Sequence, residues 1–111
     1  MLSKANRLSL KTDRFRIESE GGTLSSSFFT FLIAPRADIS SPIRLTVLVS
    51  KKFLVKSSDR HQLKRRLTEI LRLNLSKLPG GIDVILIPKR SLLGATTDQI
   101  LADLIKILNT H

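Results

Sequence analysis

The pattern of hydrophobic and polar residues predicts two β-strands in the first half of the chain. Residues 28–33 are rich in aromatic and branched aliphatic side chains, which favours a strand. Residues 43–50 come close to strict alternation, so one face of that strand is apolar and the other is polar and carries Arg44. We expect the apolar face to pack on a core and the polar face to meet a ligand. Because the two strands are consecutive, we expect them to pair as a hairpin.

Helical periodicity is clearest over residues 60–78. Apolar positions there recur at intervals of three and four residues, which is the spacing of a buried stripe on a helix. The sequence Pro79-Gly80-Gly81 ends this helix. A shorter helix is expected over residues 13–20, with Phe15 as its inward anchor, and the glycine pair that follows ends it.

The rest of the chain adds one strand and one helix. Residues 82–87 are almost continuously apolar, which predicts a strand covered on both sides. Thr96-Thr97-Asp98-Gln99 resembles a capping box, and the final helix follows it. The order α-β-β-α-β-α, with room for one further short strand, predicts an α+β fold. In this fold a small mixed sheet packs with helices in a two-layer sandwich, and the later strand–helix–strand unit forms a parallel pair.

The distribution of charge along the chain predicts a binding surface. The 111 residues fit one domain, 1–111, in which residues 1–11 are expected to form a flexible arm. The net charge is +10, and residues 4–16 and 51–66 together hold twelve of the nineteen Lys and Arg residues but two of the nine acids. A surface that serves only solubility would mix both signs. Two blocks of one sign therefore predict a binding site for a polyanion.

Several classes of function are excluded by what the sequence lacks. Without cysteine, the chain forms neither a disulfide nor a thiolate metal site. His61 and His111 have no obvious carboxylate to orient them, so catalysis by a nucleophile, a histidine and an acid is not expected. No metal site, Gly-rich phosphate loop or membrane-spanning segment is recognisable. We therefore expect a soluble, cytoplasmic binding protein with no catalytic residues.

Four kinds of partner are candidates for a basic α+β domain. Structured RNA suits a folded domain that meets backbone phosphates with clustered Lys and Arg, either in a specific complex or as an accessory of ribosomal-type RNA. An anionic membrane or an acidic protein groove suits the basic end of the helix at 60–78, although the apolar face of that helix lacks aromatic residues. Double-stranded DNA is less favoured, because it usually takes a recognition helix on a helical scaffold. Structured RNA is the favoured partner.

Two neighbouring segments narrow this choice. They are Val49-Ser50-Lys51-Lys52 and, after a short loop, Arg60-His61-Gln62-Leu63-Lys64-Arg65-Arg66-Leu67-Thr68-Glu69. Together they resemble the signature of the bacterial ribonuclease P protein subunit, in which Ser-Lys-Lys precedes a Val-Gly-Asn-type loop and the helix Arg-Asn-Arg-Ile-Lys-Arg-Leu-Leu-Arg-Glu. The likeness covers nearly the whole chain: Asn6-Arg7-Leu8 and Asp13-Arg14-Phe15 are similar to the opening of the family, and residues 83–90 to its late strand and basic turn.

The chain also departs from the family pattern. His61 and Gln62 stand where the family has Asn and Arg, and Phe53-Leu54-Val55 replaces Val-Gly-Asn. The loop before Arg60 is one residue longer. Ser19 occupies the place of a second aromatic residue four positions after Phe15. These departures bear on the strength of the contacts that Gln62 and Ser19 make.

The resemblance implies a protein that binds a large catalytic RNA and helps it to remove the 5′ leader of precursor tRNA. By analogy, the catalytic RNA would contact the basic loop and helix at Lys51, Lys52, Lys56, Arg60, Lys64, Arg65, Arg66 and Arg72. The leader would lie in a cleft between the first helix and the sheet, near Phe15, Phe29, Phe31, Arg44 and Thr46. For the phenylalanines of the strand at 28–33, a place in the core is the competing interpretation. Secondary basic positions are Arg7, Lys11, Lys89 and Arg90.

The same resemblance assigns the chemistry to the RNA. Mg²⁺ bound in the RNA complex would carry out the hydrolysis, and the protein alone would bind no cofactor and no metal. The expected assembly is one protein with one catalytic ribonuclease P RNA, acting on precursor tRNA and away from membranes. The family also implies a left-handed crossover for the strand–helix–strand unit, although such units are usually right-handed.

Overall fold

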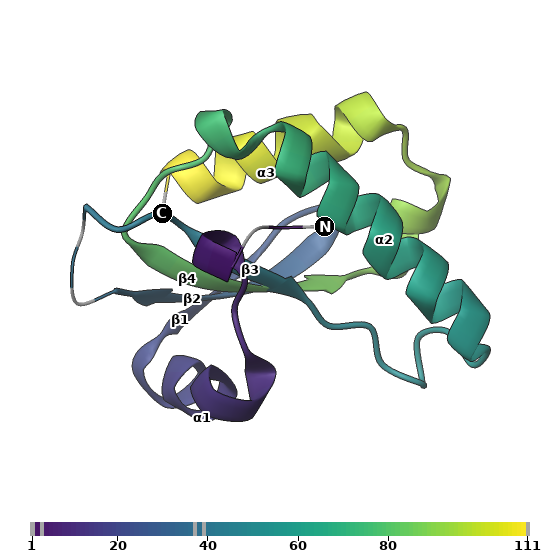
Figure 1. Cartoon of the computed structure of the whole chain (residues 1–111). Helices are drawn as coiled ribbons and strands as arrows, with labels where there is room; N and C mark the ends of the chain where they lie inside the picture. Colours follow the sequence, from purple (N-terminus) through teal and green to yellow (C-terminus); the bar gives the residue numbers. More distant parts are fainter. Residues whose placement is uncertain (1, 3, 37, 39, 111) are drawn as a thin grey trace.

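The computed structural model describes residues 2, 4–36, 38 and 40–110, and within them a four-stranded sheet carries three α-helices (Figure 1). Short 3₁₀ turns precede α1, follow α2 and follow β4. In chain order the elements are α1 (Leu10–Glu20), β1 (Gly22–Ser25), β2 (Phe29–Pro35), β3 (Arg44–Val47), α2 (Ser57–Leu73), β4 (Ile82–Pro88) and α3 (Thr97–Thr110). The predicted α+β class with a small mixed sheet is confirmed.

The strand order in the sheet is β1-β2-β4-β3. β1, the additional short strand, is antiparallel to β2, and β2 is antiparallel to β4 along all seven of its residues. The predicted hairpin between β2 and β3 is therefore wrong, because β4 lies between them. β4 is the most fully buried strand, and its place between β2 and β3 gives both of its edges backbone hydrogen-bond partners.

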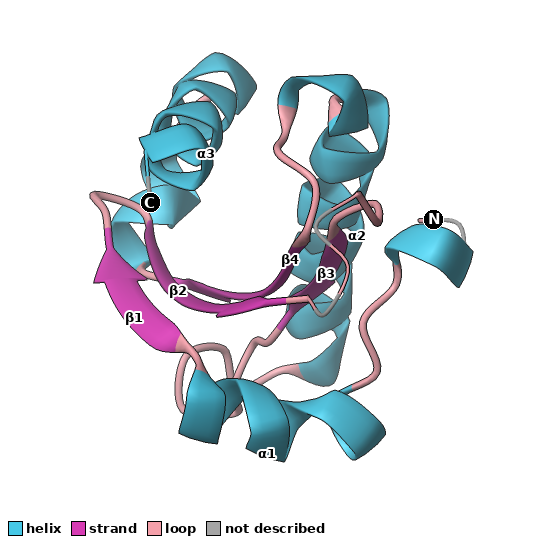
Figure 2. Ribbon diagram, turned by 90° about the vertical axis from the view of Figure 1, so that its left-hand side faces the viewer, coloured by secondary structure: helices cyan, strands magenta, loops and turns pink. Residues whose placement is uncertain are grey.

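The connection from β3 through α2 to β4 joins two parallel neighbours. Viewed from the side of α2 with β3 pointing upward, β4 lies to the left of β3 (Figures 1 and 2). The crossover is therefore left-handed, as the family resemblance implies and contrary to the usual preference.

Helices cover both faces of the sheet (Figure 2). α2 and α3 lie on one face, where the larger core contains Phe29, Phe31 and the buried stripes of both helices. α1 crosses the other face, where Ile17 packs with Ala34 and Ile85 in a smaller buried cluster. The two-layer sandwich thus describes the sheet with α2 and α3, and α1 adds a partial third layer.

The N-terminal segment packs on the protein, so the expectation of a flexible arm over residues 1–11 is wrong for its described part. Leu2 and Leu8 are buried. The backbone N–H of Leu8 donates to the carbonyl of Leu45 at 3.2 Å, and Asn6 Nδ2 donates to the carbonyl of Ile43 at 2.9 Å. The leucines, which looked isolated in a polar stretch, are the anchors that place this segment along β3. Residues 1 and 3 lie outside the described residues.

The helix ends that local sequence signals predicted agree with the structure to different degrees. The capping box before α3 forms as predicted: Gln99 N–H donates to Thr96 Oγ1 at 3.2 Å, and Thr96 N–H donates to Gln99 Oε1 at 3.0 Å. α2 begins three residues earlier than predicted and ends at Leu73, where a separate 3₁₀ turn, Leu75–Lys77, takes over. Asn74 lies between the two, and its side-chain Nδ2 donates to the carbonyl of Ile70 in the last turn of α2 at 2.8 Å.

Candidate nucleic-acid interface

An apolar stripe that faces the core orients the long helix α2. Its buried members are Leu63, Leu67, Ile70 and Leu71. The opposite side of α2 faces solvent, and a surface cavity of 560 Å³ there is lined by His61, Lys64, Arg65, Thr68 and Glu69. The predicted RNA-binding side chains Lys64 and Arg65 therefore lie together on one exposed face.

Five of the predicted RNA-binding side chains are exposed, and in the described part of the chain they make no hydrogen bond or ion pair through their charged groups. They belong to the loop before α2 and to the exposed face of α2. We call this set the basic surface: Lys51, Lys52, Lys56, Lys64 and Arg65. Their N–H groups are available for charge-assisted hydrogen bonds to phosphate oxygens.

Two other predicted RNA contacts donate to backbone carbonyls of the protein itself. Arg60 Nη1 donates to the carbonyls of Leu54 at 2.8 Å and Val55 at 2.7 Å. Arg66 Nη2 donates to the carbonyl of Ala95 at 3.1 Å and so ties α2 to the segment before α3. Both arginines support the structure around the basic surface.

The last predicted RNA contact, Arg72, is paired with an acid on the same helix. Its Nε donates to Glu69 Oε2 at 3.0 Å, and its Nη2 bonds to the other carboxylate oxygen. These hydrogen bonds lower the pKa of Glu69 and raise the pKa of Arg72. Because the two charges compensate each other, Arg72 adds less positive potential to this face of α2 than Lys64 or Arg65 does.

A second cavity brings Arg7 of the N-terminal segment to the edge of α2. It has a volume of 160 Å³, and its lining includes Arg7, Thr46 from β3, and Lys64 and Thr68 from α2. One cation from each of the two basic stretches, Arg7 and Lys64, thus lies at the same cavity. Thr46, which was predicted for the leader cleft, lies beside the basic surface.

The remaining secondary basic residues are dispersed. Lys11 is exposed on α1, and Arg90 is exposed after β4. Lys89 Nζ donates to the backbone carbonyl of Ser26 at 2.7 Å, so it holds the turn between β1 and β2. The structure does not bring these three cations into the basic surface.

Two aromatic residues predicted for the leader cleft lie in the core. Phe29 and Phe31 are fully buried on the α2 and α3 side of the sheet, with ring centroids 5.5 Å apart. Alternation along β2 places Thr30 and Leu32 on the α1 side. The prediction that Phe29 and Phe31 line the cleft is therefore wrong, and the competing interpretation as core residues is confirmed.

Phe15 is also placed differently from the expectation. Its side chain is 82% exposed, so it is not the inward anchor of α1. Ile17, which is 1% exposed, anchors the helix against the sheet. The helix begins at Leu10, and its orientation is set by the packing of Ile17 and by polar contacts of Arg16 with the sheet. The aromatic ring of Phe15 is therefore exposed to solvent on the α1 side of the molecule.

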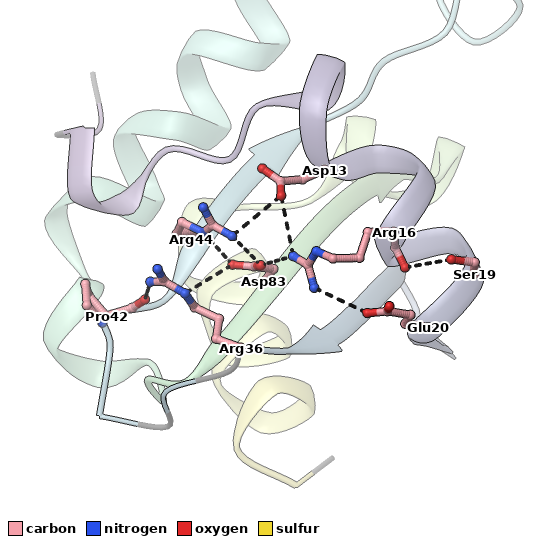
Figure 3. A network of polar contacts seen from close by, with 8 residues as sticks. All are labelled: Asp13, Arg16, Ser19, Glu20, Arg36, Pro42, Arg44 and Asp83. Atoms are coloured by element: carbon pink, nitrogen blue, oxygen red, sulfur yellow. Dashed lines mark hydrogen bonds and ion pairs between the residues drawn. The ribbon is translucent and has the colours of Figure 1, made fainter.

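A buried carboxylate that sequence reasoning did not assign to the site links α1 to the sheet (Figure 3). Asp83 is fully buried in β4, and its side chain accepts two hydrogen bonds from Arg44 at 2.7 Å. Arg16 of α1 donates to the same carboxylate, and Arg36 Nε lies 3.8 Å from it. Asp13 of α1 adds a second carboxylate, 3.7 Å from Arg16 and 3.8 Å from Arg44.

The electrostatics of this network follow from its geometry. Burial alone raises the pKa of Asp83, but the hydrogen bonds from Arg44 and Arg16 outweigh it and hold the pKa below its usual value. The hydrogen bond with Asp83 likewise raises the pKa of Arg44. The network borders a cavity of 540 Å³ that also has Glu20 and Asp38 in its lining. The one available signal was an acid inside an otherwise apolar strand, which indicates a buried ion pair.

The described residues contain no group of three or more His, Asp or Glu side chains that could hold a metal ion. Among the helices of the described chain, none has the length and apolar character needed to cross a membrane.

Comparison with known proteins decides the family. The family model described as Ribonuclease P matches residues 2–111. The chain belongs to the ribonuclease P protein family. Family members are protein subunits of the endoribonuclease that processes the 5′ end of tRNA, which confirms the sequence-based interpretation at this level.

Relatives of this ribonuclease P family member agree in sequence and in fold. The ribonuclease P protein component of Thermotoga maritima is 35% identical over 91 residues, which cover 81% of this chain and 74% of that protein. The solved structure of the ribonuclease P protein from Thermotoga maritima matches with a TM-score of 0.82 and 29% identity, over 96% of this chain and 97% of that one. The protein from Staphylococcus aureus matches with a TM-score of 0.72 and 27% identity, over 96% and 94% of the two chains.

Proposed function

We propose that this chain binds the catalytic RNA of ribonuclease P through the basic surface and contacts the 5′ leader of precursor tRNA from its α1 side. The observation that carries the proposal is the basic surface itself: five exposed cations on one loop and helix, with no partner in the described protein. Such groups gain free energy from phosphates, because binding releases the counterions that RNA condenses.

The geometry of α2 supports RNA over the other polyanions. Its apolar stripe is buried against the core, so it has no apolar face to insert into a membrane. Lys64 and Arg65 occupy its exposed face, and the loop before α2 extends that face with three lysines. A folded RNA presents phosphates at several positions in space, which suits cations spread over a loop and a helix.

For the leader, the proposal rests on the α1 side of the sheet. Phe15 offers an exposed ring on which a single-stranded base can stack. Thr46 and Arg44 lie on the same side of β3, and Arg44 is half-buried and held by Asp83. Phe29 and Phe31 take no part. The leader surface that we propose is therefore Phe15 with the polar face of β3.

The hydrolytic step is proposed to belong to the RNA. Mg²⁺ bound by the RNA would activate the attacking water and stabilise the leaving oxygen. The residues of this chain bind and orient RNA and move no proton. We propose an assembly of one protein with one catalytic RNA, in which the protein adds affinity for the substrate.

Reconstitution tests this function. The full chain is mixed with its cognate ribonuclease P RNA and precursor tRNA at a Mg²⁺ concentration too low for the RNA alone to cleave. We expect the chain to restore cleavage at the mature 5′ end, and the double variant Lys64→Ala/Arg65→Ala to restore it only at higher protein concentration. Lys77→Ala, which removes a charge outside the basic surface, serves as the matched control. No stimulation by the wild-type chain would refute the proposal.

A further inference from the structure

The loop between β3 and α2 is fixed at its first half by Ser50. The Ser50 carbonyl accepts hydrogen bonds from the N–H groups of Phe53 at 3.1 Å and Leu54 at 3.2 Å. The Ser50 hydroxyl accepts a further bond from Phe53 N–H at 3.2 Å. Phe53 and Leu54 are partly buried and pack against the core. Two apolar anchors and a closed turn therefore define the path of the chain up to residue 54.

Arg60 fixes the second half of the loop. A single nitrogen, Nη1, donates to two consecutive carbonyls, those of Leu54 and Val55. Arg60 is half-buried on the first turns of α2, so it ties the loop to the start of the helix. Arg60 bonds to the carbonyls of the peptide groups on both sides of the Val55 Cα atom. The side chain of Val55 is directed away from the protein.

Val55 is 84% exposed. A single exposed apolar residue is ordinary on a protein surface. Val55 differs from an ordinary exposed residue in its setting, because the half-buried Arg60 holds its backbone carbonyl and three lysines of the basic surface, Lys51, Lys52 and Lys56, share its loop. An apolar side chain flanked by lysines is complementary to a partner surface on which apolar groups lie between negatively charged groups.

We infer that Val55 is an apolar contact to the catalytic RNA, and that Arg60 is the positioning residue that presents it. The inference rests on the proposed function and adds a contact to it. The minor groove of an RNA helix is wide and shallow and exposes ribose and base edges between its phosphates. Val55 packs on that ribose surface while the flanking lysines bond to the phosphates. In this proposal Arg60 acts through the loop, and its predicted contact with phosphate stays a prediction.

The affinity of the cognate ribonuclease P RNA, measured against salt concentration, distinguishes this contact from a phosphate contact. Val55→Ser should weaken binding by about fivefold at every salt concentration, because it removes buried apolar area and no charge. The slope of log K against log salt should stay unchanged. Lys56→Ala should instead reduce the slope by about 1. Leu73→Ser, an exposed apolar residue at the far end of α2, is the matched control and should change neither quantity.

A double-mutant cycle tests whether Arg60 positions Val55. In an Arg60→Ala background the loop is no longer held, so Val55→Ser should cost clearly less than fivefold. Val55→Ile should bind as well as the wild type, because it keeps the apolar contact. Circular dichroism checks that each variant is folded. Full additivity of the two substitutions would overturn the role of Arg60.

The outcomes separate this inference from the proposed function. If wild type and Val55→Ser bind the RNA equally, the inference fails and the proposed function stands. If the wild type itself shows no preference for this RNA over an unrelated folded RNA, the proposed function fails. Vesicles of phosphatidylserine and phosphatidylcholine are the third arm. Vesicle binding that depends on Val55, with RNA binding that does not, would assign the loop to a membrane surface and overturn the inference.

Discussion

The carboxylate of Asp83 and the guanidinium of Arg44 meet in a two-pronged hydrogen bond, Nε to Oδ1 at 2.7 Å and Nη2 to Oδ2 at 2.7 Å. Asp83 belongs to the central strand β4 and Arg44 to the edge strand β3. Arg16 of α1 bonds to the same carboxylate (Figure 3). One buried acid thus connects both strands to the helix that carries Phe15, and it keeps that helix on the sheet.

Removal of this acid should destabilise the fold. Asp83→Ala leaves Arg44 and Arg16 without their shared partner, and breaking such a buried pair costs about 3 kcal/mol. The measurement is the free energy of unfolding from urea titration. Glu18→Ala, which breaks the exposed ion pair with Arg14, is the control and should cost less than about 0.5 kcal/mol. Equal, small losses in both variants would show that the network contributes little.

The same acid predicts a pH dependence of stability. The pKa of Asp83 in the folded protein lies below its value of about 3.9 in the unfolded chain. Its contribution to the free energy of unfolding is therefore fully present above the unfolded pKa and is lost as the pH falls through the folded pKa. Asp83→Asn should thus be less stable than wild type at pH 6, and the difference should shrink as the pH falls below about 4. A difference that stays constant down to pH 2 would contradict this role of Asp83.

The variant Phe15→Ala tests leader binding without changing the stability of the fold. Since its ring is 82% exposed, Phe15→Ala should leave the free energy of unfolding nearly unchanged. If a leader base stacks on the ring, the reconstituted holoenzyme should bind precursor tRNA roughly tenfold more weakly. Its affinity for mature tRNA, which has no leader, should not change. Equal losses for the two tRNAs would remove Phe15 from the leader surface.

Two adjacent glycines after α1 should respond differently to the same substitution. A Cβ on Gly21 would lie 2.5 Å from the carbonyl oxygens of both Ile17 and Ile33, whereas a Cβ on Gly22 meets nothing within 4 Å. Gly21→Ala must therefore push α1 away from β2, at a cost of about 2 kcal/mol. Gly22→Ala should be nearly neutral. Urea titration of the two variants checks this, and a neutral Gly21→Ala would show that α1 is not closely packed at its end.

The sequence predicted those elements whose pattern reflects local physics. Helical spacing identified α2, the Thr96 and Gln99 pair identified the start of α3, and the apolar run identified β4 as a covered strand. The motif at residues 49–69 also led to the correct family. In each case the residues that specify the feature are close together in the chain.

Features that depend on distant partners were not predictable in the same way. Alternation assigns Phe29 and Phe31 to one face of β2, but it does not say which face α2 and α3 cover. The orientation of Phe15 depends on how Ile17 and Arg16 meet Ala34 and Asp83, which lie on other strands. The partners of Arg60 and Arg66 within the protein are backbone carbonyls, and the sequence carries no side-chain signal for such partners, whether they are near in the chain, as for Arg60, or distant, as for Arg66.

The salt dependence of RNA binding by the basic surface is the most direct test of the central claim. The affinity of the full chain for its cognate ribonuclease P RNA is measured from low to high salt, for the wild type and for Lys64→Ala/Arg65→Ala. If both side chains contact phosphates, the slope of log K against log salt should fall by about 2 in magnitude, because each lost contact removes about 1. A slope that is the same in the two proteins would contradict the claim that this face of α2 binds the RNA.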